Sequence, residues 1–271
     1  MPARKKSAQP KSEPETTQEN ESAAEPAAKT LLFYERPVPL NRDQHRALRL
    51  TPGNGDFSFA RGINSVPVAG VEFPEACRDY PIVFAGNSPQ EVVPSVLLGL
   101  RQDENLFVNA EGAWQDTYLP AFVRRYPFVL AEKEGGEEDF TVCVDEGYPG
   151  LTTEGEGEAL FDEAGKEGPY LQRVLEFLSE FQGQMRRTRT FVDRLNELGL
   201  LEQKVIQVAP AGGQPAVLQG LYVIDEQRLQ GLDDASIRQL LDAGELAWIY
   251  AHLLSLGNVN RLSARLDAAN A

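Results

Sequence analysis

Two segments of the chain carry an arginine and a tyrosine at the same spacing. Residues 73–85 align without gaps with residues 119–131, and both follow the pattern P-x-x-x-R-x-Y-P-x-V-x-A. A guanidinium group can bind an anionic group through two parallel hydrogen bonds, which an amide or ammonium cannot reproduce. The repeated positions and the neighbouring second arginine are therefore candidate ligand- or partner-binding residues, namely Arg78, Tyr80, Arg124, Arg125 and Tyr126.

The same pattern also has a purely structural explanation. The first proline of each copy suits the start of a short helical turn, and the arginine then lies where a cation stabilises the end of a helix. The tyrosine precedes a proline and is therefore biased towards extended backbone. Two alternatives follow. Either two duplicated β-units place their Arg–Tyr pairs around one cleft, or both copies are simple helix-to-strand junctions.

Other side chains capable of catalysis or metal binding are few. The chain has two cysteines, Cys77 and Cys143, and two histidines, His45 and His252. None of them has another potential metal ligand at the sequence spacing that metal sites use. A buried free cysteine usually behaves as a small apolar residue. We expect His252 to lie in the core and His45 to be exposed. The sequence thus predicts no catalytic residue, no metal site and no cofactor.

The chain is strongly acidic, and the acidity is local. Its 41 Asp and Glu residues against 26 Lys and Arg residues give a net charge of −15. Residues 132–167 contain thirteen acidic residues and two lysines. This charge excludes a general electrostatic surface for nucleic acid. Within this stretch, residues 145–150 lack the alternating carboxylates of a calcium loop. We therefore expect the acidic stretch to be a solvated glycine-rich loop.

The start of the chain has the composition of a disordered tail. Residues 2–29 contain no Val, Ile, Leu, Phe, Tyr or Trp, so nothing there can offset the entropy of folding. We expect a disordered tail over residues 1–29 and a single domain over residues 30–271. The basic first residues are not followed by an apolar segment, unlike a secretory signal, and a cytoplasmic location is the default expectation.

The first half of the domain is predicted to be rich in β-strands. Short apolar runs are separated by Gly, Asn and Pro throughout residues 31–165. The predicted strands are 81–85, 92–100, 104–109, 127–132 and 139–145.

A long amphipathic helix is predicted after this region. Apolar residues recur at helical spacing from Leu171 to Leu198, which is typical of a helix with one buried face. Pro169 suits its first position, and Gly199 suits its C-terminal stop.

The last third of the chain predicts a hairpin followed by helices. Residues 204–209 and 217–225 flank a loop rich in Gly and Pro, as in a β-hairpin. Asp233 suits the N-cap of a helix that ends before Gly244.

The last helix is predicted to run from Glu245 to about Leu266. Its centre is apolar nearly all round, which indicates a buried helix that is too short to span a bilayer. We expect Leu253 and Leu256 to be fully buried. Together the elements predict an α+β fold, in which a β-rich N-terminal part packs with a long helix and a buried C-terminal helix.

Four segments carry the motifs of one protein family, and they are Phe33–Leu40, Ser65–Pro74, Phe122–Glu132 and Ala251–Asn258. These motifs occur in the expected order, and on them the chain resembles the SapC family of bacterial proteins over about residues 31–266. The resemblance implies an association with the bacterial surface layer and carries over no catalytic residue. A peptide-transporter permease of the same name needs several apolar stretches of about 20 residues, and this chain has none.

These observations lead to two hypotheses about function. The first is a soluble, non-enzymatic accessory or structural protein of surface-layer or cell-envelope assembly, which binds another protein. A surface location would then require a non-classical export route. The alternative is a ligand-binding protein or an enzyme that uses the paired Arg and Tyr positions. The sequence identifies neither the partner nor the oligomeric state.

Overall fold

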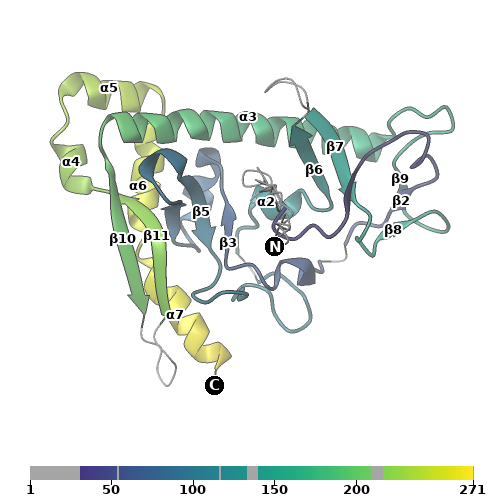
Figure 1. Cartoon of the computed structure of the whole chain (residues 1–271), viewed down its shortest axis with the longest axis horizontal. Helices are drawn as coiled ribbons and strands as arrows, with labels where there is room; N and C mark the ends of the chain where they lie inside the picture. The colour runs from purple at the N-terminus through teal and green to yellow at the C-terminus, as the bar shows by residue number, and fades with distance from the viewer. Residues whose placement is uncertain (1–30, 54, 116, 133–139, 209–215, 271) are drawn as a thin grey trace, which may run out of the picture. The chain divides into compact units, whose positions relative to one another are not determined.

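The computed structural model describes residues 31–53, 55–115, 117–132, 140–208 and 216–270. The chain divides into two units, Met1–Leu32 and Phe33–Ala271. The predicted tail of residues 1–29 lies outside the described residues. All the helices and strands discussed below belong to the second unit, and they combine helices with antiparallel sheets, which confirms the predicted α+β class (Figure 1).

The largest sheet has five antiparallel strands in the order β10-β11-β4-β5-β3. A second sheet has the order β1-β7-β6 and a small third one the order β8-β2-β9. The strands are β1 (Pro37–Pro39), β2 (Arg49–Leu50), β3 (Ser65–Pro67), β4 (Ile82–Ala85), β5 (Val93–Leu97), β6 (Phe128–Glu132), β7 (Phe140–Asp145), β8 (Leu151–Thr152), β9 (Glu158–Ala159), β10 (Leu201–Val208) and β11 (Ala216–Ile224).

The longest helix, α3 (Pro169–Glu197), matches the predicted one. Pro169 is its first residue, and Gly199 follows its end with a φ of 62°. The amide of Leu200 donates to the carbonyl of Leu195 at 2.9 Å, and the amide of Gly199 donates to that of Asn196 at 3.0 Å. This pair of bonds is a Schellman motif, so glycine supplies the left-handed turn that ends the helix.

Helix α3 connects two hydrophobic clusters. Phe181 near its middle and Phe191 in its C-terminal half belong to the main core around the five-stranded sheet. Its N-terminal part contributes Leu171 and Leu178 to a second cluster near the smaller sheets. At 1.5 Å per residue the helix is about 43 Å long, enough to line both clusters, and in Figure 1 it extends along the top from the five-stranded sheet to β6 and β7. The rest of the second cluster is Leu50, Phe128, Val144, Leu160 and Phe161.

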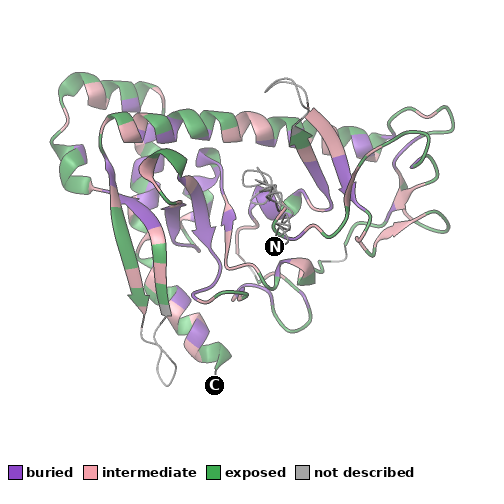
Figure 2. Cartoon of the chain, in the orientation of Figure 1, coloured by how far each residue is buried: buried purple, intermediate pink, exposed green. Residues whose placement is uncertain are grey.

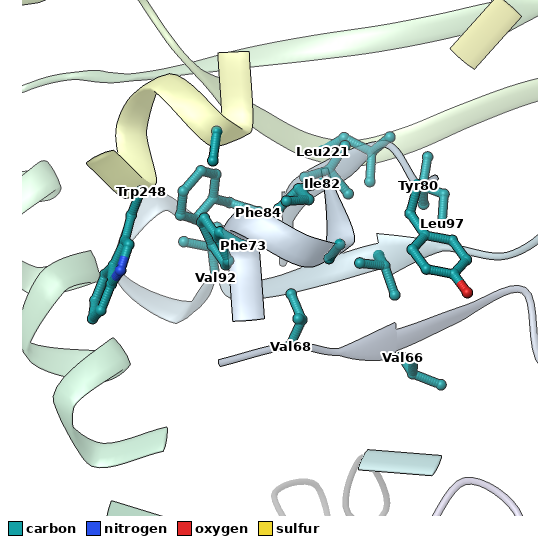
Figure 3. Close-up of a cluster of buried hydrophobic side chains, with 14 of the residues drawn as sticks. Val66, Val68, Phe73, Tyr80, Ile82, Phe84, Val92, Leu97, Leu221 and Trp248 are labelled. Carbon is teal, nitrogen blue, oxygen red and sulfur yellow. The ribbon is translucent and has the colours of Figure 1, made fainter. Parts of the chain in front are cut away.

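The main core surrounds β4, the central strand of the five-stranded sheet (Figure 3). Phe73, Ile82 and Phe84 are fully buried there. Trp248 packs beside Gly70, where a Cβ atom would lie 2.3 Å from the indole ring. Because such a distance is far below van der Waals contact, glycine is required for this close approach. In Figure 2 the inner strands are mostly buried, whereas the edge strand β10 is largely exposed.

Both copies of the repeated motif form a short helix followed by a strand. The first copy forms α1 (Phe73–Ala76) and then β4, and the second forms α2 (Ala121–Arg124) and then β6. Strand β4 lies in the five-stranded sheet and β6 in the sheet with β1 and β7. The expected helix-to-strand junction is therefore confirmed at both places, and the two copies begin strands of different sheets.

The predicted strand over residues 104–109 is wrong. This segment forms only an isolated bridge between Val108 and Trp114. Its apolar side chains instead fill the core from an irregular path, since Phe107 is buried and its ring centroid lies 4.6 Å from that of Tyr80. The strands predicted at 81–85, 92–100, 127–132 and 139–145 are present as β4, β5, β6 and β7.

The hairpin and the Asp233 cap are confirmed. Strands β10 and β11 pair antiparallel, and the loop between them, residues 209–215, lies outside the described residues. Helix α4 (Glu226–Gln230) follows, and then α5 (Asp234–Asp242), in which the Asp233 carboxylate accepts the amide of Ser236 at 2.9 Å.

The single last helix is a wrong prediction. The chain forms α6 (Glu245–Ser255) and α7 (Asn258–Ala269), separated at Leu256 and Gly257. The Asn258 amide at the start of α7 donates to the carbonyl of Cys77 at 2.7 Å, which fixes the new helix against the end of α1.

Helix α6 is buried on one face only. Trp248, Ile249 and His252 are buried, but Leu254 is 76% exposed. Leu253 and Leu256 are half-buried, so the expectation that both are fully buried is also wrong.

Candidate functional site

A pocket of about 220 Å³ lies where the second copy of the motif meets three distant segments of the chain. Its walls are mostly aromatic or aliphatic, and it carries one arginine and one aspartate. The lining residues are Leu50, Pro52, Gly53, Asp56, Phe57, Phe59, Leu119, Val123, Arg124, Tyr126, Pro127, Tyr148 and Tyr170.

The secondary structure explains how these residues meet. Helix α2 ends at Arg124, and the chain turns through Tyr126 into β6. The loop after β7 supplies Tyr148, and the first turn of α3 supplies Tyr170. Residues 50–53 and 56–59 supply most of the remaining lining residues. In Figure 1, α2 lies between β3 and β6.

The tyrosine of the second motif copy is the centre of the aromatic wall. The Tyr126 ring stacks on Phe59 with a centroid distance of 4.1 Å and an angle of 25°. Tyr148 meets it edge to face at 5.5 Å and 89°. Both arrangements are favoured by the ring quadrupoles. They fix the rings against one another before any ligand arrives.

Asp145 anchors the loop that carries Tyr148. Its carboxylate is fully buried and accepts the amides of Arg36 at 2.8 Å, Glu35 at 2.9 Å and Gly147 at 2.9 Å. A buried carboxylate needs such partners because it has lost its hydration. Part of the acidic stretch therefore builds structure, contrary to the expectation of a wholly solvated loop.

Arg124 is held on the pocket by two contacts. Its guanidinium carbon lies 5.4 Å from the centroid of the Phe177 ring, and the group also hydrogen-bonds with the Tyr118 hydroxyl. The Tyr118 hydroxyl in turn donates to the Glu72 carboxylate at 2.7 Å. A guanidinium has five N–H donors. No carboxylate among the described residues forms an ion pair with Arg124, so donors remain for a bound group.

The other titratable groups of the pocket keep fixed protonation states near neutral pH. Hydrogen bonds from Ser58 lower the pKa of the Asp56 carboxyl, which stays ionised. Burial and a hydrogen bond to the Asp145 carboxylate raise the pKa of Tyr126. Burial also raises the pKa of Tyr148 and of Tyr170. These phenols stay protonated, so the pocket can hydrogen-bond and stack but holds its charges constant.

The first copy of the motif lies elsewhere. Arg78 pairs with Glu75 at 2.8 Å and its side chain is 70% exposed. Tyr80 is fully buried, and its hydroxyl accepts the indole N–H of Trp114 at 3.1 Å and hydrogen-bonds with Thr117 at 2.9 Å. Neither residue lines the pocket. The structure therefore does not bring the two Arg–Tyr pairs into one cleft.

Arg125 is the buried member of the candidate set. Its guanidinium carbon lies only 3.8 Å from the centroid of the Phe122 ring and 5.8 Å from that of Tyr34. Burial lowers its pKa. Arg125 is thus packed among aromatic rings, and it does not line the pocket.

Comparison with known proteins identifies the family. The SapC family model matches residues 40–262, which is most of the chain. The chain belongs to the SapC family. No curated protein and no solved structure matches it.

The match to the SapC family spans every described residue that lines the pocket. Sequence reasoning reached only Arg124 and Tyr126 of this set, through the repeat. Phe57, Phe59, Tyr148 and Tyr170 had no sequence signal, because they come from segments that only the fold brings together.

The histidines and cysteines of this SapC chain contribute to packing. His45 is buried, contrary to expectation, because its Nδ1 accepts the amide of Asn41 at 2.9 Å and so stabilises a turn. His252 is buried beneath the five-stranded sheet, as predicted. Burial raises the pKa of both Cys77 and Cys143, so their thiols stay protonated. No group of metal-binding side chains occurs within the described ranges.

In the described part of the chain, no helix combines the length and the apolar character that a membrane span requires.

Proposed function

We propose that this SapC protein acts without catalysis, by binding a partner protein during surface-layer or cell-envelope assembly. The observation that carries the proposal is the pocket at Arg124, with its aromatic wall and its exposed cation. Tyrosine and arginine are the residue types that most often dominate the energy of protein interfaces.

The composition of the pocket supports binding over acid–base catalysis. A general acid or base works best when its pKa lies near the working pH. The Asp56 carboxyl has a pKa below its usual range, and the phenols of Tyr126, Tyr148 and Tyr170 have raised values. Among the described lining residues there is no Ser, Cys, His or Lys. The groups that are present, an arginine and several aromatic rings, are suited to hold a partner in place.

The proposal uses one motif copy only. Arg124 and Tyr126 serve recognition, whereas Arg78 and Tyr80 serve the fold, through the ion pair with Glu75 and the buried hydroxyl network. Arg78 therefore provides a matched control, since it occupies the same motif position as Arg124 but lies away from the pocket.

The test is retrieval of the partner from envelope extracts of the source bacterium with the full chain as bait. Arg124→Gln is expected to reduce the retained partner at least tenfold, because an amide cannot replace bidentate guanidinium bonds. Arg78→Gln is expected to retain the partner like the parent. Melting curves of both variants should match the parent closely. Equal retention by Arg124→Gln and the parent, with matching melting curves, would contradict the proposal.

A further inference from the structure

We infer that the pocket holds the C-terminal residue of the partner, with an aromatic side chain packed against the pocket rings and its carboxylate on Arg124. This inference rests on the proposed function and specifies the chemistry that the pocket recognises. It is carried by the volume of the pocket, by the arrangement of its rings and by the distribution of its charges.

The volume limits the guest to one large side chain. At about 220 Å³ the pocket is smaller than the roughly 300–1,000 Å³ of sites that enclose drug-sized ligands. A single aromatic residue has a compact ring and few rotatable bonds, so little conformational entropy is lost when it is held. The pocket is therefore suited to one anchoring residue.

The ring arrangement favours an aromatic guest. Phe59, Tyr126 and Tyr148 already contact one another by stacking and by edge-to-face packing. Phe57 and Tyr170 line the same pocket. A guest ring can join such a set with the offset or edge-to-face geometry that adds about 0.5–1.5 kcal/mol per pair beyond burial.

The charges specify where the carboxylate lies. Arg124 offers N–H donors on the pocket, whereas Asp56 is an ionised carboxylate that repels an anion. A guest carboxylate is therefore stable only on the Arg124 side. A C-terminal residue carries its carboxylate and its ring on one Cα atom, and thus satisfies both the cation and the aromatic wall within this small space.

The net charge of the chain adds selectivity. The 41 acidic against 26 basic residues produce a negative field that repels strongly anionic segments. A ligand with a single carboxylate, paired with a nearby guanidinium, is repelled less by this field than a ligand with several negative charges. The structure thus selects a terminal carboxylate next to a ring over an acidic peptide.

The experiment measures the binding of labelled peptides to the full chain by fluorescence anisotropy. The probe is a flexible Gly/Ser peptide that ends in phenylalanine with a free carboxylate. The controls are the same peptide with a C-terminal amide and one that ends in alanine. The free acid is expected to bind the parent at least tenfold more tightly than either control.

Variants then assign the effect to the charges. Arg124→Gln should remove the difference between acid and amide, whereas Arg78→Gln should preserve it. Asp56→Asn should tighten binding of the acid severalfold, because it removes a repulsive charge and keeps an oxygen that can accept the Ser58 amide.

Three outcomes would overturn the inference, namely equal binding of acid and amide, equal binding of the peptides that end in phenylalanine and in alanine, and an acid preference that survives Arg124→Gln. If a partner is retrieved in an Arg124-dependent manner but the peptides show no acid preference, the inference fails and the proposed function stands. If the peptides behave as expected but no partner is retrieved, the proposed function fails.

Discussion

Replacing Phe84 by alanine is expected to lower the free energy of unfolding by about 3–5 kcal/mol, the usual cost of removing a buried aromatic ring. Phe84 lies on the central strand β4 and is fully buried. Its ring lies 5.1 Å from that of His252 and 6.3 Å from that of Phe191, so it joins α6 and α3 to the sheet. Urea unfolding of the full chain near pH 7.5 measures the effect.

The matched control for Phe84 is an exposed apolar residue. Leu254→Ala is expected to change the free energy of unfolding by less than about 0.5 kcal/mol, as at ordinary surface sites, because Leu254 is 76% exposed. A cost below about 1 kcal/mol for Phe84→Ala would show that the main core is not centred on β4.

Acid is expected to destabilise the fold through His252. The ring is buried against Phe84, and its Nε2 accepts the amide of Ile224 at 3.0 Å, which requires a neutral imidazole. Burial lowers the pKa of His252 from 6.5 to about 4. The unfolded state therefore binds this proton more readily, so stability is lost as the pH falls from about 6.5 towards 4. At 1.36 kcal/mol per pKa unit, the loss amounts to about 3 kcal/mol.

His252→Gln tests this assignment, because the amide oxygen can accept the Ile224 amide but does not titrate. Unfolding midpoints of the parent and the variant are compared at pH 7.5 and at pH 4.5. Between pH 7.5 and pH 4.5 the parent should lose more stability than the His252→Gln variant. An equal loss in both proteins would show that carboxylates, and not His252, cause the acid sensitivity.

Much of the fold could be predicted because it depends on local patterns. Helix α3 has a proline start, a glycine stop and continuous apolar spacing, and it forms as predicted. The hairpin β10–β11 and the Asp233 cap are also local features. Strands β2, β8 and β9 have two residues each. Because such strands are too short to show an alternating pattern, they could not be predicted from the sequence.

The wrong predictions have a common physical cause. The apolar run from Leu246 to Leu256 predicted one buried helix, yet the chain bends at Gly257, where Asn258 finds the backbone carbonyls of Cys77 and Tyr80. Residues 104–109 predicted a strand, yet their side chains fill the core from an irregular segment. In both cases a tertiary contact overrides the local pattern.

The candidate site could be predicted only in part. The repeat led to Arg124 and Tyr126, which line the pocket, and equally to Arg78 and Tyr80, which do not. The difference arises because the two copies begin strands of different sheets and meet different neighbours. Tyr148 and the other walls come from distant segments, and a single sequence does not reveal such contacts.

The most direct test of the account is site-specific photo-crosslinking in cells of the source organism. A photoreactive phenylalanine analogue is placed at Pro52, an exposed residue on the pocket, and separately at Leu254, the most exposed large apolar residue of those described. We expect one partner adduct from position 52, none from position 254, and loss of the adduct when Arg124→Gln is added. An adduct that forms at position 254 instead, or one at position 52 that survives Arg124→Gln, would contradict the account.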